Sequence, residues 1–242
     1  MYRLVSLMLI VLLLAGCGEN PTPEALPDSI DLLTEAATNV RASQTLRLDV
    51  ERTGADYEIE TDYGSVNFKR AVAQYIAPDV LQATVRVLAA GLPIDVDIFS
   101  KGEDQWFRGI WTANIWVNAM FAPGFNPERL ISQEAGFQAA LQALINISTP
   151  TLGELEDGTP VYHLTGTAKG EDITALMVGL IEASGNVLVD VFIDRNLLLP
   201  VRFIIVQPET ITDEEPEPTT WTVDVYDVNA EPKLNAPPEG IE

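Results

Sequence analysis

The sequence has a single cysteine, a single histidine and few basic residues. Among its 242 residues are 14 lysines and arginines against 36 aspartates and glutamates, which gives a formal net charge of −22. One cysteine cannot form an internal disulfide, and one cysteine with one histidine cannot build a zinc site of the usual kind. So acidic a chain is unsuited to nucleic acid or to polybasic contact with anionic lipid headgroups. We therefore expect no cofactor, no metal and no nucleic-acid partner.

The first sixteen residues are typical of an export signal. Arg3 supplies a short positive region, and residues 4–14 form an almost unbroken apolar run. That run is about half the ~20 residues that a membrane-spanning helix needs. The sequence Leu14-Ala15-Gly16-Cys17 matches a lipobox, in which the cysteine thiol accepts a diacylglycerol. We expect cleavage before Cys17 and a lipid anchor on it, since the only cysteine of the chain lies where a lipobox requires it.

The anchor predicts where the protein is located. Cleavage removes Arg3 and leaves 226 residues with a formal net charge of −23. The mature chain is expected at the cell membrane, lipid-anchored on the extracytoplasmic side. Gly18 is not the aspartate that retains lipoproteins at a Gram-negative inner membrane, so an outer membrane and a monoderm surface both stay open.

The sequence indicates three segments. Residues 1–16 are the signal peptide, residues 17–27 are the lipidated cysteine with a flexible tether containing three prolines, and residues 28–242 are a single domain. In that domain the apolar period is near 3.6 residues over 29–43, 126–148 and 171–183, which predicts helices. It is two over several intervening stretches, including a hairpin at 187–206 and a last strand at 221–228.

This order predicts an α+β fold with an antiparallel sheet built as a meander. The helices either seal the sheet over a dry core or roof a cavity lined by alternating side chains, and periodicity alone does not separate the two arrangements.

The common catalytic constellations lack their parts. His163 lies in a strand pattern, and no Gly-x-Ser-x-Gly elbow accompanies it. We interpret it as a strand histidine with one hydrogen-bonded nitrogen. The acidic stretch 213–217 does not have the spacing of an EF-hand and is interpreted as a solvated loop. The chain is therefore not expected to be an enzyme.

Several motifs resemble the LppX/LprA/LprF/LprG family of bacterial lipoproteins, whose fold is akin to that of LolA and LolB. Residues 125–131 (FNPERLI) are similar to that family's Phe-x-Pro-x-x-Leu-Leu helix start, and residues 161–166 (VYHLTG) to its central strand. Residues 189–194 (VDVFID) and 199–202 (LPVR) are similar to its hydrophobic strand, Ile-Asp turn and Leu-Pro-x-Arg return. The likeness extends over the mature body, and none of these motifs is catalytic.

The resemblance implies a strongly curved, unclosed antiparallel β-sheet, a half-barrel, with helices roofing the concave face around an apolar cavity. It also implies that an acylated lipid or glycolipid binds there for transport or trafficking in the cell envelope, with an envelope lipid transporter as a further partner. Plain core packing is the competing interpretation of each candidate lining residue. The candidates are Val189, Val191, Ile193, Val201 and Phe203 of the C-terminal hairpin, with Leu130, Phe137 and Leu141 of the roof.

A second interpretation is a non-catalytic envelope lipoprotein that binds another protein or has a structural role. It depends on an aromatic cluster formed by Trp106, Trp111, Trp116 and Phe121, which would have to form an exposed patch. A hydrolase using His163 is a distant third.

Overall fold

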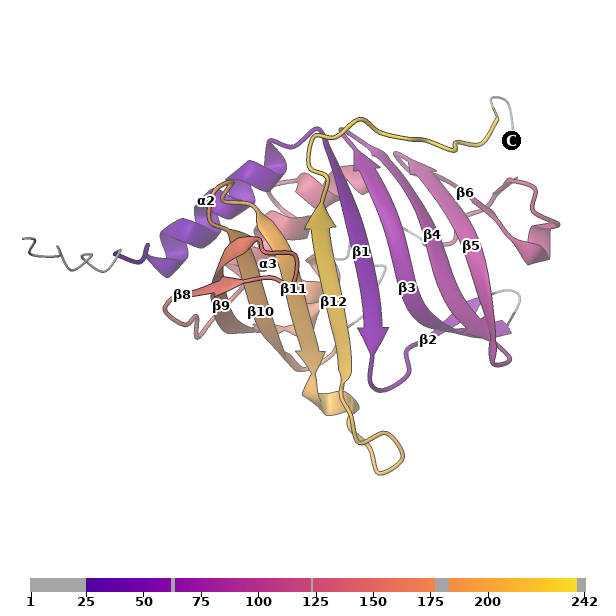
Figure 1. Cartoon of the computed structure of the whole chain (residues 1–242). Helices are drawn as coiled ribbons and strands as arrows, with labels where there is room; N and C mark the ends of the chain where they lie inside the picture. Colours follow the sequence, from indigo (N-terminus) through magenta and orange to yellow (C-terminus); the bar gives the residue numbers. More distant parts are fainter. Residues whose placement is uncertain (1–24, 62–63, 123, 177–182, 239–242) are drawn as a thin grey trace, which may run out of the picture.

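A computed structural model describes residues 25–61, 64–122, 124–176 and 183–238. The predicted signal peptide, Cys17 and most of the tether lie outside these residues. The body is one antiparallel sheet of twelve strands (Figure 1). The strands are β1 (Thr45–Thr53), β2 (Glu58–Thr61), β3 (Gly64–Ile76), β4 (Val80–Ala89), β5 (Leu92–Lys101), β6 (Asp104–Arg108), β7 (Val117–Asn118), β8 (Thr151–Glu154), β9 (Pro160–Lys169), β10 (Asn186–Asp194), β11 (Pro200–Gln207) and β12 (Thr219–Tyr226).

The sheet is curved and open. Its strands run in the order β7-β6-β5-β4-β3-β1-β12-β11-β10-β9-β8, and β2 pairs with β3 outside this path. Two meanders meet where the first strand pairs with the last, in a register from Arg47 opposite Tyr226 to Thr53 opposite Thr220. Because β7 and β8 lie at opposite edges, the described strands form a half-barrel. The predicted fold class is confirmed.

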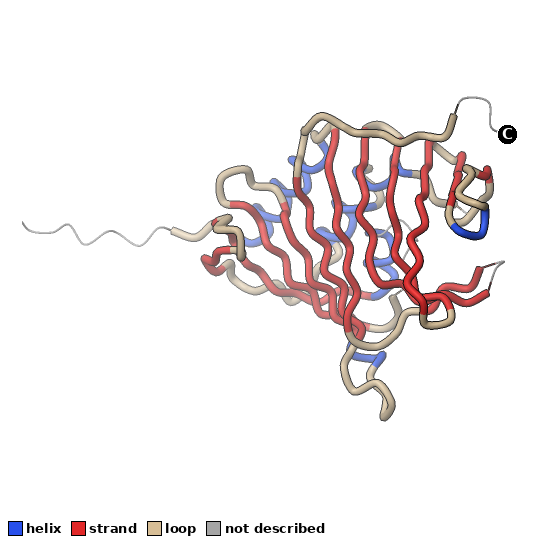
Figure 2. Tube along the Cα trace, turned by 45° about the vertical axis from the view of Figure 1, so that its right-hand side comes forward, coloured by secondary structure: helices blue, strands red, loops and turns tan. Residues whose placement is uncertain are grey.

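The longer helices lie on one face of this sheet (Figure 2). The first, α2, begins as expected after an N-cap, because the Asp28 carboxylate accepts hydrogen bonds from the backbone N–H of Ile30 and Asp31. Ile30 at its start is 58% exposed, and its buried side includes Leu33 and Val40. The helical segments are α2 (Ser29–Arg41), η1 (Ile110–Thr112), η2 (Pro127–Ile131), α3 (Gly136–Gln142), α4 (Gly170–Leu176) and η3 (Pro208–Thr210).

The single helix expected over 126–148 is wrong. Asn126 does cap a helical segment with Pro127 in its first turn, but η2 ends at Ile131 and α3 starts only at Gly136. Gly136 has φ +64°, and a Cβ there would lie 2.1 Å from the carbonyl oxygen of Leu130. The break therefore depends on a glycine at which the backbone of α3 closely approaches the end of η2.

The remaining predicted elements agree in position. The strands expected over 161–168, the hairpin 187–206 and the last strand correspond to β9, β10 with β11, and β12. The helix expected over 171–183 is present as α4 up to Leu176, and residues 177–182 lie outside the described part. Within that described part, none of the helices has the length and apolar character needed to cross a membrane.

A buried arginine fixes one end of the central strands. The Arg52 side chain is 1% exposed at the end of β1, next to a turn that contains Gly54. Its guanidinium satisfies five acceptors from β3 and from the chain that follows β1, so a charge removed from water keeps its hydrogen bonds. The acceptors are the carbonyl oxygens of Phe68, Gly54 and Ala55, Oδ1 of Asp56 and Oδ1 of Asn67.

Replacing this guanidinium tests its role. Arg52→Met should lower the free energy of unfolding by about 3–5 kcal/mol, because the buried Phe68 carbonyl oxygen and Asn67 Oδ1 lose the guanidinium and the Asp56 carboxylate loses its buried partner. Arg70→Met is the matched control in the same sheet, since Arg70 pairs with Asp49 at 51% exposure and its loss should cost less than about 1 kcal/mol. Urea unfolding measures both, and equal losses would contradict the role of Arg52.

The break between η2 and α3 is tested in the same way. Gly136→Ala should destabilise the protein by more than 2 kcal/mol, roughly, because it combines left-handed strain with a backbone overlap. Gly91→Ala has the same strain at φ +79° but no neighbouring atom within 4 Å of the added methyl group. It should cost only about 1–2 kcal/mol, and a Gly136→Ala variant no less stable than this would show that the close approach relaxes easily.

Candidate functional site

The concave face of the sheet is apolar because its strands alternate between inward apolar and outward polar side chains. In β10, Val189, Val191 and Ile193 are at most 2% exposed. Asp190 and Phe192, which alternate with them, are half-buried on the outer face. The same alternation continues in β12 and β1, so the inner face is a continuous hydrophobic surface.

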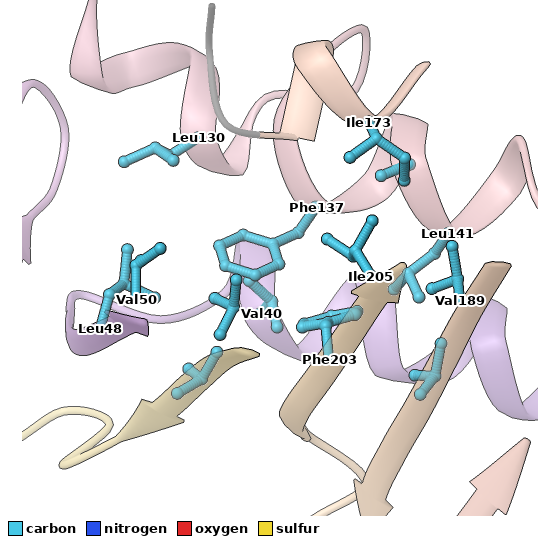
Figure 3. Close-up of a cluster of buried hydrophobic side chains, with 14 of the residues drawn as sticks. Val40, Leu48, Val50, Leu130, Phe137, Leu141, Ile173, Val189, Phe203 and Ile205 are labelled. Atoms are coloured by element: carbon cyan, nitrogen blue, oxygen red, sulfur yellow. The ribbon is translucent and has the colours of Figure 1, made fainter. Parts of the chain in front are cut away.

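Side chains from the helices pack against this hydrophobic surface. Figure 3 shows Phe137 of α3 directed toward the strands, with Phe203 and Ile205 of β11 directed toward the helices. The ring centroids of Phe137 and Phe203 are 5.7 Å apart with planes tilted by 39°. We refer to η2, α3 and α4 with α2 as the roof, and to the side chains between roof and sheet as the apolar layer.

The structure brings most of the predicted lining residues together. Seven of them belong to one buried cluster and are no more than 5% exposed. Val201 is half-buried and outside it, because the pairing of β10 with β11 shifts register between Phe192 and Ile193. The seven are Val189, Val191, Ile193, Phe203, Leu130, Phe137 and Leu141.

Several members of the apolar layer were not singled out from the sequence. Figure 3 also shows Val40 of α2, Leu48 and Val50 of β1 and Ile173 of α4 in it. Each lies on an apolar stripe or an alternating strand, so its burial followed from periodicity. The packing of these residues with the C-terminal hairpin did not follow from periodicity, because that contact depends on the pairing of β1 with β12.

A tyrosine marks the end of the layer near β3. Tyr75 is fully buried, and its hydroxyl donates a hydrogen bond to the carbonyl oxygen of Pro78 at 2.7 Å. Burial raises the pKa of this hydroxyl, with a further contribution from the charge of Glu128. The group is therefore neutral over the physiological range and adds no charge to the layer.

The outer face of the sheet carries charges paired across the strands. The Asp49 carboxylate raises the pKa of Arg70, and the Arg86 guanidinium lowers the pKa of Asp95 through hydrogen bonds of 2.8 and 2.9 Å. These pairs keep the outer face hydrated and charged, so the sheet separates water from the apolar layer. They are Asp49–Arg70, Arg86–Asp95, Asp97–Arg108 and Asp224–Arg202, the last shared with Glu156.

His163 lies on this outer face, away from the apolar layer. Its Nε2 is 2.6 Å from Oδ1 of Asp190, and its ring stacks on Phe192 at 4.4 Å. The interpretation as a strand histidine with a hydrogen-bonded nitrogen is confirmed. Both partners come from the neighbouring strand β10, so the three side chains form a cross-strand packing unit.

Two open hollows of the described surface lie beside η2 and beside β10. One, of about 440 Å³, lies beside residues 128–135, and the other, of about 270 Å³, lies between Asn146, Thr165 and Asp190. The second hollow is also lined by Leu188 and by Val189, one of the predicted lining residues.

The aromatic cluster is not an exposed patch, and the prediction that depended on it is corrected. Trp116 is only 6% exposed, with the Arg108 guanidinium 4.7 Å from its ring centre. Trp106, Trp111 and Phe121 are half-buried, and Trp106 packs on Phe99 with ring centroids 5.7 Å apart. The rings turn toward the sheet edge because burying their area there is favourable.

An open antiparallel half-barrel with helices packed on its apolar concave face defines the class of fold. No protein-family model matches the sequence, and no curated protein sequence is similar to it. Solved structures share the fold, among them two mycobacterial proteins. The lipoprotein LppX from Mycobacterium tuberculosis has a TM-score of 0.57 at 15% identity, over 86% of this chain and 98% of LppX. LprF from Mycobacterium bovis has a TM-score of 0.57 at 13% identity, over 88% of this chain and 99% of LprF.

These similarities confirm the fold that the motifs of the sequence implied. At 15% and 13% identity, these two similarities show the fold of the chain.

The pairs of the outer face predict a pH dependence. Because the pKa of Asp95 is lower in the folded chain than in the unfolded one, its contribution to stability is present above pH ~4 and is lost as pH falls through the lowered value. Asp95→Asn should therefore be less stable than the parent at pH 7, by less than about 1 kcal/mol because the pair is exposed, and the difference should shrink as the pH falls below about 4. Asp213→Asn, in an exposed loop, is the control and should match the parent at pH 7; a gap for Asp95→Asn that does not shrink on acidification would refute the assignment.

Proposed function

We propose that the chain is a membrane-anchored, non-enzymatic lipoprotein that binds an acylated lipid or glycolipid between the roof and the concave face of the sheet. The observation that carries the proposal is the continuous apolar layer at that position, on the fold of the lipoprotein LppX. Its purpose would be transport or trafficking of the lipid in the cell envelope, with an envelope lipid transporter as a partner.

The chemistry of the layer suits acyl chains. Burial of apolar area contributes about 25 cal/mol per Å², so a lipid with two or three chains needs no directional polar groups to bind tightly. The innermost residues, among them Val191 and Phe203, are aliphatic or aromatic. The proposed contact surface is the set of seven predicted residues that the structure brings together.

Binding requires the roof to separate from the sheet, because Phe137 and Phe203 pack directly on one another. The roof is suited to this movement. The helix α3 has only seven residues, and its contact with the sheet through Phe137 is apolar. Acyl chains would then replace contacts between roof and sheet with contacts of the same apolar kind.

The predicted lipid on Cys17 would locate the protein at a membrane. It would hold the body at the extracytoplasmic side of the cell membrane, or at the outer membrane of a diderm cell, where its ligand is found. The tether limits how far the anchored body moves, so any lipid it carries while anchored moves locally.

Native mass spectrometry of the mature chain with Cys17→Ser tests the proposal. Protein purified from cells that make acylated lipids should carry a lipid, released on denaturation and identified by its fragments. A homogeneous ligand-free mass, together with no uptake of a fluorescent diacyl lipid, would refute it.

A roof variant locates the lipid. Phe137→Ala should lower the free energy of unfolding of lipid-free protein by about 3–5 kcal/mol, because it leaves a cavity in the layer. If acyl chains occupy this space, added lipid should raise the melting temperature of Phe137→Ala more than that of the parent. Gln142→Ala, at an exposed position of the same helix, should behave as the parent in both measurements. Equal lipid-induced shifts in all three proteins would place the lipid elsewhere.

A further inference from the structure

A stretch without any charged residue follows β6. Residues 109–127 contain no lysine, arginine, aspartate or glutamate, whereas charged residues make up 21% of the chain. We refer to residues 109–122, which include η1 and β7, as the hydrophobic loop. It lies at one edge of the sheet, where β7 is the last strand (Figure 1).

Large aliphatic side chains of the hydrophobic loop point into solvent. Ile110 is 66% exposed, Ile115 64% and Met120 68%, and Val117 is exposed between the last two. Trp116, which lies between Ile115 and Val117, is buried. The loop therefore uses its aromatic residues as an inner support and its aliphatic residues as an outer surface.

The hydrophobic loop is held by hydrogen bonds. The buried Gln105 amide donates to the carbonyl oxygen of Ala122 at 2.8 Å and accepts from its backbone N–H at 2.9 Å. The backbone N–H groups of Asn114 and Ala119 donate to the carbonyl oxygens of Gly109 and Gln105. The exposed aliphatic side chains are therefore presented by a fixed turn.

We propose that the hydrophobic loop inserts into the surface of a lipid bilayer, as a membrane contact separate from the anchor. Exposed isoleucine, valine and methionine with tryptophan behind them match the chemistry of the bilayer interface. The distribution of charge also favours a lipid bilayer as the surface that the loop contacts. An acidic surface is repelled by anionic headgroups, and the uncharged loop lets this protein approach them without that cost.

The position of the loop relative to the tether supports a lipid surface. The tether enters α2 beside the chain that leads into β8, where the Ser29 hydroxyl donates to the carbonyl oxygen of Ser148. The hydrophobic loop lies at the opposite edge of the sheet, beside β6 and β7 (Figures 1 and 2). Fully extended, the eleven residue-to-residue steps from Cys17 to Asp28 reach about 40 Å, and the ten spacings between the eleven strands of the sheet path amount to about 48 Å along the sheet. The tether and the hydrophobic loop together fix how the body lies on the membrane. The tether alone does not fix this orientation.

The loop also continues into the roof. Phe125 is buried, and the chain passes from it to η2, whose Leu130 belongs to the apolar layer. If the layer takes up lipid as proposed above, insertion of the loop places the bilayer next to the first segment of the roof. The membrane contact itself does not depend on lipid uptake and is tested without it.

The test uses the mature chain with Cys17→Ser and vesicles of phosphatidylethanolamine and phosphatidylglycerol. This protein should sediment with the vesicles, and binding should persist at high salt because it is apolar. The double variant Ile115→Ser with Met120→Ser should reduce the vesicle partition coefficient by about 100-fold, roughly tenfold per side chain. Leu197→Ser with Ile211→Ser removes two exposed aliphatic side chains elsewhere and should change it by less than about twofold.

A label reports insertion directly. With Cys17 replaced, Asn118→Cys introduces the only thiol, and an environment-sensitive fluorophore on it should shift to the blue when vesicles are added. The same label on Leu197→Cys should not shift. Absence of vesicle binding by the parent, or equal loss in both double variants, would overturn the proposal. A change from dimer to monomer in the loop variant without vesicle binding would overturn it too, in favour of a second copy of this chain.

Discussion

The pairing of β1 with β12 is the interaction on which the rest of the structure depends. Each meander alone is a small sheet with an exposed edge at its inner strand. Seven residue pairs between Arg47–Thr53 and Tyr226–Thr220 join these edges and produce one sheet wide enough to curve around the helices. Since the paired segments are more than 160 residues apart in the sequence, the joint forms at a large entropic cost. The buried Arg52, at the end of β1, secures that strand to β3 with hydrogen bonds from its guanidinium to Phe68 and Asn67.

The joined sheet has two unlike faces, and their difference explains where binding is proposed. The outer face satisfies its charges across strands, as in the pairs of Arg86 with Asp95 and of Arg202 with Asp224. The inner face buries aliphatic and aromatic side chains against helices such as α3, whose seven residues are too few to be stable alone. The roof is therefore held mainly by apolar contacts, which are not directional and which acyl chains can replace. Lipid uptake and folding of the roof would thus depend on the same side chains, Phe137 and Phe203 among them.

The charged residues are distributed unevenly along the chain. A chain with a net charge of −22 keeps most of its surface hydrated, yet residues 109–127 carry no charge at all and present Ile110, Ile115 and Met120 to solvent. The buried Trp116 shows why the exposed aromatic patch considered from the sequence does not form. The large rings gain most from burial and turn inward, and smaller aliphatic side chains take the outside positions. The resulting surface is chemically matched to lipid.

The sequence by itself determined the local features. Period-two alternation located β9 to β12, the carboxylate of Asp28 and the amide of Asn126 marked two helical starts, and motifs around 189–202 implied the half-barrel. These features depend on neighbouring residues, so a linear pattern contains them. Only the tertiary structure decided the break at Gly136, the register shift that leaves Val201 outside the apolar layer, and the burial of Trp116. Each of these depends on a backbone or side chain distant in the sequence, whose position follows from how the two meanders join.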